Sequence, residues 1–262
     1  MDLGLSGRKA LVTGSFRGTG AAIARRLAAE GARVRVHGFD AGPTAAVAAS
    51  IREAGSDAEP VVGDLSSDEG VAEIAAAAGD VDVLVASYGT ADGGDWQSPS
   101  AAWLEAYQKN VLSAVRVIHA FLPGMRARGF GRIVLLGTIG TTRPAARMPH
   151  YYAAKASLPA LTLSLAKEVA GSGVTVNLVS PGILATEEVR KSLTERAHRK
   201  GRSTAWADVE REAAGSFLPN LVGRIGRPEE VADVVAFLAS ERAAFVTGAN
   251  WRIDGGATDA VV

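Results

Sequence analysis

The sequence has 262 residues, 47% of them hydrophobic, and its 28 basic and 28 acidic side chains give a formal net charge of zero. This length suits one large α/β domain, and a zero net charge argues against nucleic acid or an anionic membrane as partner, because both attract a basic excess. The absence of cysteine excludes disulfides, thiolate catalysis and cysteine-ligated zinc, and the four scattered histidines show no metal-ligand spacing.

The N-terminus lacks the basic start and apolar core of a signal peptide, and no apolar run approaches the ~18 residues of a membrane span. We therefore expect a cytoplasmic protein in which residues 1–262 form a single domain.

A glycine-rich turn follows the first predicted strand. Residues 9–13 have the composition of a buried strand, and the next seven residues, GSFRGTG, open a helix that reaches about Glu30. Glycines let the backbone approach a phosphate, and a helix N-terminus offers free N–H groups and a positive dipole end. A turn that binds nothing is the alternative. The predicted pyrophosphate-binding residues are Gly14, Ser15, Arg17, Gly18, Thr19 and Gly20.

The end of the second predicted strand bears on the choice of cofactor. In dinucleotide folds an acidic residue here binds the adenosine ribose, whereas basic surroundings accommodate a 2′-phosphate. Gly38 occupies the acidic place and Arg17 can reach the same region, so we favour NADP(H) over NAD(H). In the open alternative, Arg17 is a solvated surface charge and Asp40 serves the ribose.

Two polar residues in the first half are ambiguous. Asp64, after the third predicted strand, could cap the helix that begins near Asp68 or accept a hydrogen bond from an adenine amino group. Asn110 lies in a long helix predicted over residues 99–128. A lone helical asparagine is usually a satisfied core group or marks a bend.

The fifth predicted strand and the helix after it carry the main chemical signal. Thr138 follows the strand, and Tyr151 and Lys155, four positions apart, share one helix face while Tyr152 is turned away. A free tyrosine titrates near pH ~10, and a neighbouring positive charge lowers that pKa. Tyr151 is therefore a candidate acid–base group with Thr138 aimed at the same oxygen, although a snorkelling lysine on an amphipathic turn gives the same pattern.

The segment 187–220 is charged and mostly helical. Its basic residues form either a solvated helix face or a mobile lid that meets an acidic substrate group, and we assign the segment as a substrate-side lid. These residues are Arg190, Lys191, Arg196, Arg199, Lys200 and Arg202.

Strands alternate with helices along the whole chain, which predicts a Rossmann-like, doubly wound parallel α/β sheet of about seven strands with helices on both faces. Ligands of such sheets bind beyond the carboxyl ends of the strands. The predicted strands cover residues 9–13, 33–37, 58–62, 81–87, 133–136, 174–179 and 249–253; further helices are predicted over 43–54 and 229–239.

Several motifs recur in a specific order along the chain. They are Thr13-Gly14-x-x-x-Gly18-x-Gly20, Asp64, Asn110, Thr138 with Tyr151-x-x-x-Lys155, Pro181-Gly182-x-x-x-Thr186, Arg224 to Ala232, Thr247-Gly248 and Asp254-Gly255-Gly256. In this order and spacing the chain resembles the short-chain dehydrogenase/reductase family over nearly its whole length.

The resemblance implies hydride transfer between a nicotinamide and a carbonyl or secondary alcohol. In the family's scheme Tyr151 donates the proton to the carbonyl oxygen, and Lys155 binds the nicotinamide ribose and lowers the pKa of the tyrosine. Thr138 would orient the substrate oxygen, and Asn110 would hold a water in the proton relay.

The same scheme implies further contacts and an assembly. Asp64 would contact adenine, and Thr186 and the backbone near Ile183 would contact the carboxamide. A homotetramer, or a homodimer, would pack through the helices around Asn110 and Tyr151. The remaining cofactor-binding residues expected from the resemblance are Leu65, Gly89, Pro181 and Gly182.

The chain departs from the family in three places. Thr138 replaces the usual serine, Ala86-Ser87-Tyr88-Gly89 replaces Asn-Asn-Ala-Gly, and the segment between Thr186 and Arg224 is longer than in similar ketoacyl-carrier-protein reductases. Tyr88 could project toward the nicotinamide side. We predict an oxidoreductase for a small carbonyl or alcohol; the alternatives are an NAD-dependent alcohol dehydrogenase and a catalytically silent dinucleotide-binding protein.

Overall fold

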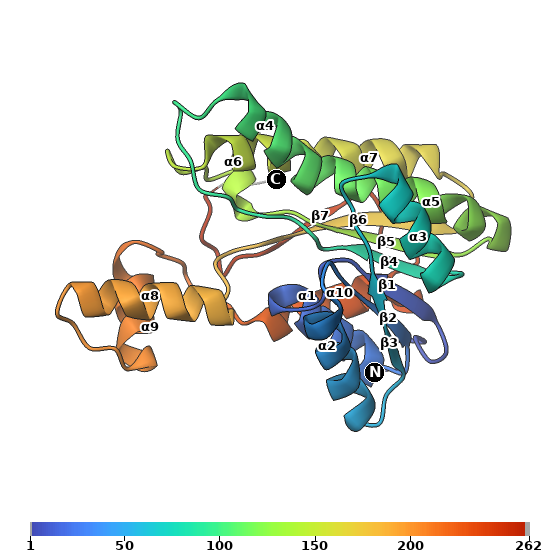
Figure 1. Ribbon diagram of the computed structural model, residues 1–262, viewed down its shortest axis with the longest axis horizontal. Helices are drawn as coiled ribbons and strands as arrows, with labels where there is room; N and C mark the ends of the chain where they lie inside the picture. The colour runs from blue at the N-terminus through green and yellow to red at the C-terminus, as the bar shows by residue number, and fades with distance from the viewer. Residues whose placement is uncertain (1, 260–262) are drawn as a thin grey trace.

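A parallel sheet forms the centre of the molecule (Figure 1). The computed structural model describes residues 2–259. Its strands are β1 (Lys9–Val12), β2 (Arg33–Gly38), β3 (Ala58–Val62), β4 (Val83–Ala86), β5 (Gly131–Leu136), β6 (Val174–Pro181) and β7 (Asn250–Ile253). They pair in parallel in the order β3-β2-β1-β4-β5-β6-β7. This order reverses direction after β3, so the predicted doubly wound, Rossmann-like sheet is confirmed.

Helices cover both faces of the sheet, as predicted. The α-helices of the described residues are α1 (Gly18–Ala29), α2 (Ala41–Glu53), α3 (Asp68–Ala78), α4 (Ser100–Tyr107), α5 (Ser113–Arg128), α6 (Pro149–Ala156), α7 (Leu158–Glu168), α8 (Glu187–Arg199), α9 (Trp206–Ser216) and α10 (Pro228–Ala239). Figure 1 shows α1, α2 and α10 on one face and α3 to α7 on the other, while α8 and α9 project beyond both layers.

Successive side chains of the central strands point alternately into two apolar cores, one on each face of the sheet. In β1, Ala10 and Val12 belong to the core that contains α1 and α10, whereas Leu11 belongs to the core that contains α3 and α5. Because both faces are covered, every position of a central strand must be apolar or tightly packed, and β5 is buried along its full length. The continuous apolar runs of the sequence follow from this geometry.

The parallel arrangement brings the carboxyl ends of the strands to one edge. The glycine loop (residues 14–20) follows β1, Asp64 lies beyond β3, residues 87–89 follow β4, Thr138 lies beyond β5, and residues 182–186 follow β6. These polar segments come from across the sequence, and the fold gathers them at the edge where such sheets bind ligands.

The long helix predicted over residues 99–128 is interrupted. A π-helical turn, Gln108–Leu112, separates α4 from α5 and contains Asn110. A π-turn carries an extra residue in the helical ladder and is frequent at functional sites. None of the helices between residues 2 and 259 has the length and apolar character needed to span a bilayer.

Candidate active site

Thr138 and Tyr151 meet at the carboxyl end of β5. Thr138 begins the 3-10 turn Ile139–Thr141, and its Oγ1 accepts a hydrogen bond from the Gly140 N–H at 3.1 Å. Tyr151 lies in the first turn of α6, and its hydroxyl is hydrogen-bonded to the Thr138 side chain. The fold therefore brings together the two hydroxyls that the sequence placed 13 positions apart.

The predicted lowering of the Tyr151 pKa by Lys155 is wrong for this arrangement. Burial raises the pKa of the Tyr151 phenol to about 12; the hydrogen bond to Thr138 lowers it, and the neighbouring Tyr152 raises it, by smaller amounts. Burial likewise lowers the pKa of Lys155 to about 8. The Lys155 Nζ donates to the Leu136 carbonyl at 2.8 Å. Withdrawal from water therefore outweighs the expected effect of the cation on the phenol.

Asn110 and Lys155 converge on Gly89. A Cβ at position 89 would lie 2.5 Å from Asn110 Oδ1 and 2.9 Å from Lys155 Nζ, so only glycine fits there. Asn110 Oδ1 accepts from the Thr90 N–H at 3.1 Å, and Nδ2 donates to the carbonyls of Thr90 and Ala106, both at 3.0 Å. Asn110 is thus a satisfied core amide that fixes the segment after β4 beside Lys155.

The glycine loop packs tightly against its own first turn. A Cβ on Gly20 would lie 2.5 Å from the Gly14 carbonyl oxygen, which explains the glycine there. Ser15 Oγ donates to the Val12 carbonyl at 2.7 Å and accepts from the His37 N–H at 2.9 Å. These two bonds fix the glycine loop to β1 and β2. The N-terminus of α1 is left facing the sheet edge, where it suits a phosphate.

His37 is a supporting residue that the sequence analysis missed. Its Nδ1 accepts from the Gly14 N–H at 3.1 Å, so the ring hydrogen lies on Nε2, which donates to the Gly63 carbonyl at 3.2 Å. Burial lowers the pKa of His37 to about 4 and keeps the ring neutral. The ring therefore ties the glycine loop to the turn after β3. A histidine near the end of a predicted strand was the only signal in the sequence.

The region beyond β2 has no room for an acidic side chain at position 38. A Cβ on Gly38 would lie 2.1 Å from Thr44 Oγ1 and 2.9 Å from Phe16 Cβ. The Arg17 guanidinium is exposed; it lies 5.2 Å from the centre of the Phe16 ring and 3.0 Å from a Glu188 carboxylate oxygen. Asp40 precedes α2 without capping it.

Asp64 does not cap α3. Its carboxylate accepts from the N–H and the hydroxyl of Ser66, each at 2.7 Å, while Ser67 Oγ caps the helix by accepting from the Gly70 N–H at 3.1 Å. The capping alternative is therefore wrong. Leu65 is buried in the apolar core, so only its backbone can face a ligand.

Two other predicted positions are now located. Thr186 caps α8 by accepting from the Val189 N–H at 3.3 Å, and its methyl group lies 3.7 Å from where a Cβ on Gly18 would be. The Tyr88 ring packs at a tilt of 54° against Phe39, just after the end of β2, with 4.8 Å between the ring centres. The suggestion that Tyr88 points toward the nicotinamide side is not supported, because its ring packs at the opposite, β2 side of the edge.

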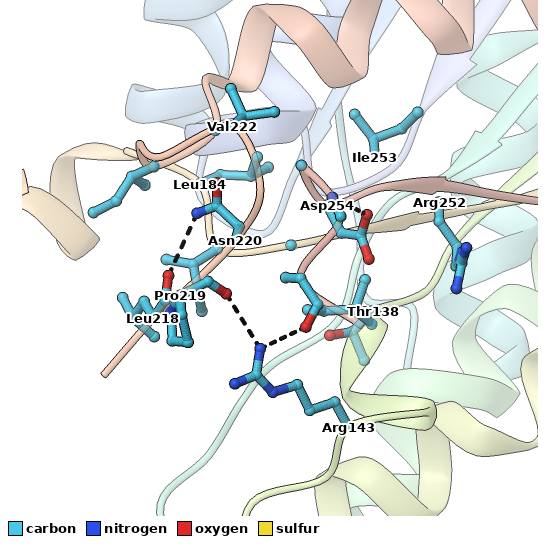
Figure 2. Close-up of a pocket in the computed structure, with 18 of the residues that line it drawn as sticks. Thr138, Arg143, Leu184, Leu218, Pro219, Asn220, Val222, Arg252, Ile253 and Asp254 are labelled. Carbon is cyan, nitrogen blue, oxygen red and sulfur yellow. Dashed lines mark hydrogen bonds between the residues drawn. The ribbon is translucent and has the colours of Figure 1, made fainter. Parts of the chain in front are cut away.

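A cavity of about 500 Å³ adjoins Thr138 (Figure 2). Residues 217–226 and the chain after β7 form much of its wall, and Arg143 joins these two segments by donating to the carbonyls of Pro219 at 3.3 Å and Ala257 at 2.5 Å. Tyr152, on the other helix face from Lys155 as predicted, borders this cavity. The cavity thus reaches the carboxyl end of β5 at Thr138 and the Tyr152 side of α6.

Three of the basic residues in the segment 187–220 contact side chains of the same segment. The guanidinium of Arg190 lies 4.5 Å from the centre of the Trp206 ring, and that of Arg196 lies 4.0 Å from the centre of the Phe217 ring. Arg202 forms an ion pair with Glu212. These contacts hold α8 against α9. Within residues 2–259 no group of histidine or acidic side chains is placed to hold a metal ion.

Comparison with known proteins identifies the family. The family described as "Enoyl-(Acyl carrier protein) reductase" matches residues 14–258. The chain belongs to the short-chain dehydrogenase/reductase family. It is 35% identical to the 3-oxoacyl-[acyl-carrier-protein] reductase FabG of Escherichia coli, over 97% of this chain and 98% of that protein. It is 33% identical to the uncharacterized oxidoreductase YvaG of Bacillus subtilis, over 98% of each chain. The chain is accordingly an NAD(P)-dependent oxidoreductase that acts on CH–OH or C=O groups.

Solved structures of this short-chain dehydrogenase/reductase family superimpose on the whole chain. L-Sorbose reductase from Gluconobacter frateurii, complexed with NADPH and L-sorbose, matches with a TM-score of 0.93 at 31% identity and covers 100% of both chains. A 3-oxoacyl (acyl-carrier-protein) reductase from Agrobacterium tumefaciens with NADP bound matches with a TM-score of 0.86 at 35% identity, over 97% of this chain and 96% of that chain.

Proposed function

We propose that this reductase transfers a hydride between NADP(H) and a small carbonyl or secondary alcohol, with Tyr151 as the general acid–base. The observation that carries the proposal is the hydrogen bond between the Tyr151 hydroxyl and Thr138, because Thr138 itself lines a cavity of about 500 Å³. Cavities of ~300–1,000 Å³ are typical of small-molecule sites.

The residues at the sheet edge suit a dinucleotide. The glycine loop lets a pyrophosphate approach the N-terminus of α1, and the Gly89 backbone packs closely against the Asn110 amide and the Lys155 ammonium. When bound, the nicotinamide supplies or accepts the hydride. Gly14, Ser15, Gly18, Thr19 and Gly20 would line the pyrophosphate; Asp64 and the Leu65 backbone would line the adenine; and Pro181, Gly182, Ile183 and Thr186 would line the carboxamide.

The proposed proton transfer follows from the shifted pKa values of Tyr151 and Lys155. A phenol with a pKa of about 12 is protonated at neutral pH, so Tyr151 is ready to donate a proton to a carbonyl oxygen. Thr138 holds the phenol and can donate to the same oxygen. A Lys155 ammonium with a pKa of about 8 is still mainly charged at pH 7, and it can stabilise the phenolate that proton donation leaves behind. Asn110 holds the segment that carries Gly89.

The preference for NADP(H) rests on Arg17 and Gly38. Position 38 cannot hold a ribose-binding carboxylate, whereas Arg17 supplies a cation beside the glycine loop. The NADPH and NADP named for the two structural neighbours agree with this choice. An NAD(H)-dependent enzyme would instead use Asp40 for the ribose.

The surrounding segments take supporting roles in the proposal. Residues 187–220 act as a substrate-side lid, because their last part, around Phe217 and Leu218, borders the cavity. Residues 1–262 act as one dinucleotide-binding and catalytic unit. A homotetramer or homodimer would cover Leu104 on α4, which is exposed.

The test is turnover of a ketone panel with NADPH by the wild-type chain and by Tyr151→Phe. Removing the phenol should lower kcat by at least ~10²-fold, the usual size of general acid catalysis, and leave NADPH affinity within a factor of about two. Tyr107→Phe, at an exposed phenol on α4, is the matched control and should keep its rate. An active Tyr151→Phe would remove Tyr151 from the mechanism, and NADPH binding without turnover of any ketone would favour a silent dinucleotide-binding protein.

A further inference from the structure

Two aromatic side chains meet over the start of the glycine loop. In the sheet β1 lies between β2 and β4; Phe39 follows β2 directly, and Tyr88 is the second residue after β4. The planes of the two rings are tilted by 54°, so the rings do not cover each other face to face. Both side chains pack against the apolar core of α3 and α5, yet both are only partly buried. Each ring therefore keeps part of its surface exposed near the carboxyl end of β1.

The backbone of Tyr88 is held against the loop that is proposed to bind the pyrophosphate. Its N–H donates to Thr13 Oγ1 at 3.2 Å, and a Cβ on Gly14 would lie 3.0 Å from the Tyr88 Cα. Position 14 must therefore be glycine for Tyr88 to lie this close. These contacts give the aromatic side chain a defined place directly beside the glycine loop.

The charged neighbours of Tyr88 show which part of the edge its ring faces. Burial raises the pKa of the Tyr88 phenol, and the charges of Lys109, Asp92 and Asp64 lie close enough to act on it. Asp64 is the residue that we propose for the adenine amino group. An aromatic ring near a carboxylate suits adenine, which has a flat π face and an exocyclic amino group that can donate to the carboxylate.

We infer that the adenine of NADP(H) stacks on the exposed surface of the Tyr88 ring, with Phe39 supporting that ring; this rests on the proposed function. Position 88 corresponds to the alanine of the family's Asn-Asn-Ala-Gly pattern, and a methyl group offers little surface for stacking. Stacking on an aromatic side chain stabilises a bound base through its π face. Tyr88 is thus a binding residue for the adenosine half of the cofactor that the family pattern does not supply.

A tyrosine in place of an alanine could instead fill the space that the base needs. The contacts of the ring favour a wall over a plug. Tyr88 packs sideways on Phe39 and against the apolar core, and its backbone is fixed by Thr13. The ring is therefore part of the lining of the sheet edge.

The experiment measures the Kd of NADPH and of 2′,5′-ADP, which carries only the adenosine half of the cofactor, by calorimetric titration. Tyr88→Leu removes the ring and keeps a large apolar side chain, so both Kd values should rise by about tenfold, within the range of base–aromatic stacking. Tyr88→Phe keeps the ring and should bind both ligands within about twofold of the wild type.

A matched control separates stacking from a general effect of the substitution. Tyr107→Leu makes the same change at an exposed tyrosine of α4 and should leave both Kd values unchanged. Urea midpoints of all variants show whether they are folded.

The outcomes separate this inference from the proposed function. Unchanged or tighter binding of 2′,5′-ADP by Tyr88→Leu would overturn the stacking, and tighter binding would mean that the ring occupies the place of the base. An equal loss in Tyr88→Phe would also overturn it, because the hydroxyl would then be the binding group. These results leave the reductase assignment standing.

The reductase assignment can fail alone or together with this inference. If the wild-type chain reduces no ketone but Tyr88→Leu still shows the tenfold losses, the reductase assignment is overturned and the stacking stands. A wild-type chain that binds neither NADPH nor 2′,5′-ADP would overturn both.

Discussion

The Arg17 guanidinium of the glycine loop lies 3.0 Å from a carboxylate oxygen of Glu188 in the first turn of α8. This ion pair joins the phosphate-binding loop to the lid segment, 171 positions further along the chain. Both side chains are well exposed, at 61% and 49%, so the pair contributes at most ~1 kcal/mol. A 2′-phosphate that recruits Arg17 must compete with Glu188.

Replacing Glu188 should therefore improve NADPH binding. In Glu188→Gln the guanidinium is free for the phosphate and a nearby like charge is removed, so we expect the Kd for NADPH to fall by about two- to fivefold, equivalent to an ion pair of up to ~1 kcal/mol. The Kd for NADH should not change. Fluorescence titration of both cofactors measures this, with Glu187→Gln as the control; Arg17→Ala should weaken NADPH far more than NADH. Equal shifts for both cofactors would contradict the role of Arg17.

Installing an acidic residue at position 38 should not create an NADH enzyme. In Gly38→Asp the new Cβ would collide with Thr44 Oγ1 and Phe16 Cβ, at 2.1 and 2.9 Å. Overpacking of this kind typically costs ~1–3 kcal/mol in the free energy of unfolding. Gly42→Asp, where a Cβ meets nothing within 4 Å, is the control. Urea unfolding and the two cofactor affinities report the result. A stable Gly38→Asp that prefers NADH would show that the space at position 38 opens readily.

The fold could be predicted because its strands are buried on both sides. Such strands must be continuous apolar runs, so β5 and β6 were visible in the sequence, and the gathering of polar turns at one edge followed from parallel pairing. The π-turn around Asn110 was not visible. It depends on how the Asn110 amide bonds the Thr90 backbone, 20 positions away, and no helical periodicity encodes that contact.

The site was predictable where its signal is local. Tyr151 and Lys155 share a face because a helix turns every 3.6 residues. The direction of the Tyr151 pKa shift was not predictable, because it depends on burial by distant segments, and burial reverses the expected sign. His37 and the Arg17–Glu188 pair were missed for the same reason: each acts on a partner brought close only by the folded sheet.

His37 should make the chain sensitive to mild acid. Its pKa is about 4 in the folded chain, below the ordinary 6.5 that it regains on unfolding. Between pH 4 and pH 6.5 the unfolded chain binds more protons at this histidine than the folded chain does. The free energy of unfolding therefore falls as the pH falls, by about 2 kcal/mol between pH 7 and pH 5. His37→Gln should lose that much less stability over the same range in urea unfolding. His119→Gln, at an exposed histidine, should behave as the wild type does. If the His37→Gln and wild-type curves run parallel, the ring is not held neutral by burial.

Lys155 should give a pH dependence of the same sign in alkali. Its pKa of about 8 in the folded chain is below its ordinary 10.5, so burial penalises the ammonium fully below pH 8. Between pH 8 and pH 10.5 the folded chain has lost the Lys155 proton, whereas the unfolded chain still binds it. The free energy of unfolding therefore rises with pH in this range. From pH 7 to pH 9.5 the gain is about 2 kcal/mol, and stopping at about pH 9.5 avoids titration of the tyrosines.

Lys155→Met removes that titrating group and keeps an unbranched side chain. Its stability relative to the wild type should therefore be highest at pH 7 and should fall by about 2 kcal/mol by about pH 9.5, in urea unfolding of the cofactor-free proteins. Lys167→Met, at an exposed lysine, should show a constant difference from the wild type. A constant difference for Lys155→Met as well would mean that Lys155 keeps its ordinary pKa. Its ammonium would then remain charged throughout this pH range, and its effect on Tyr151 would not fade in mild alkali.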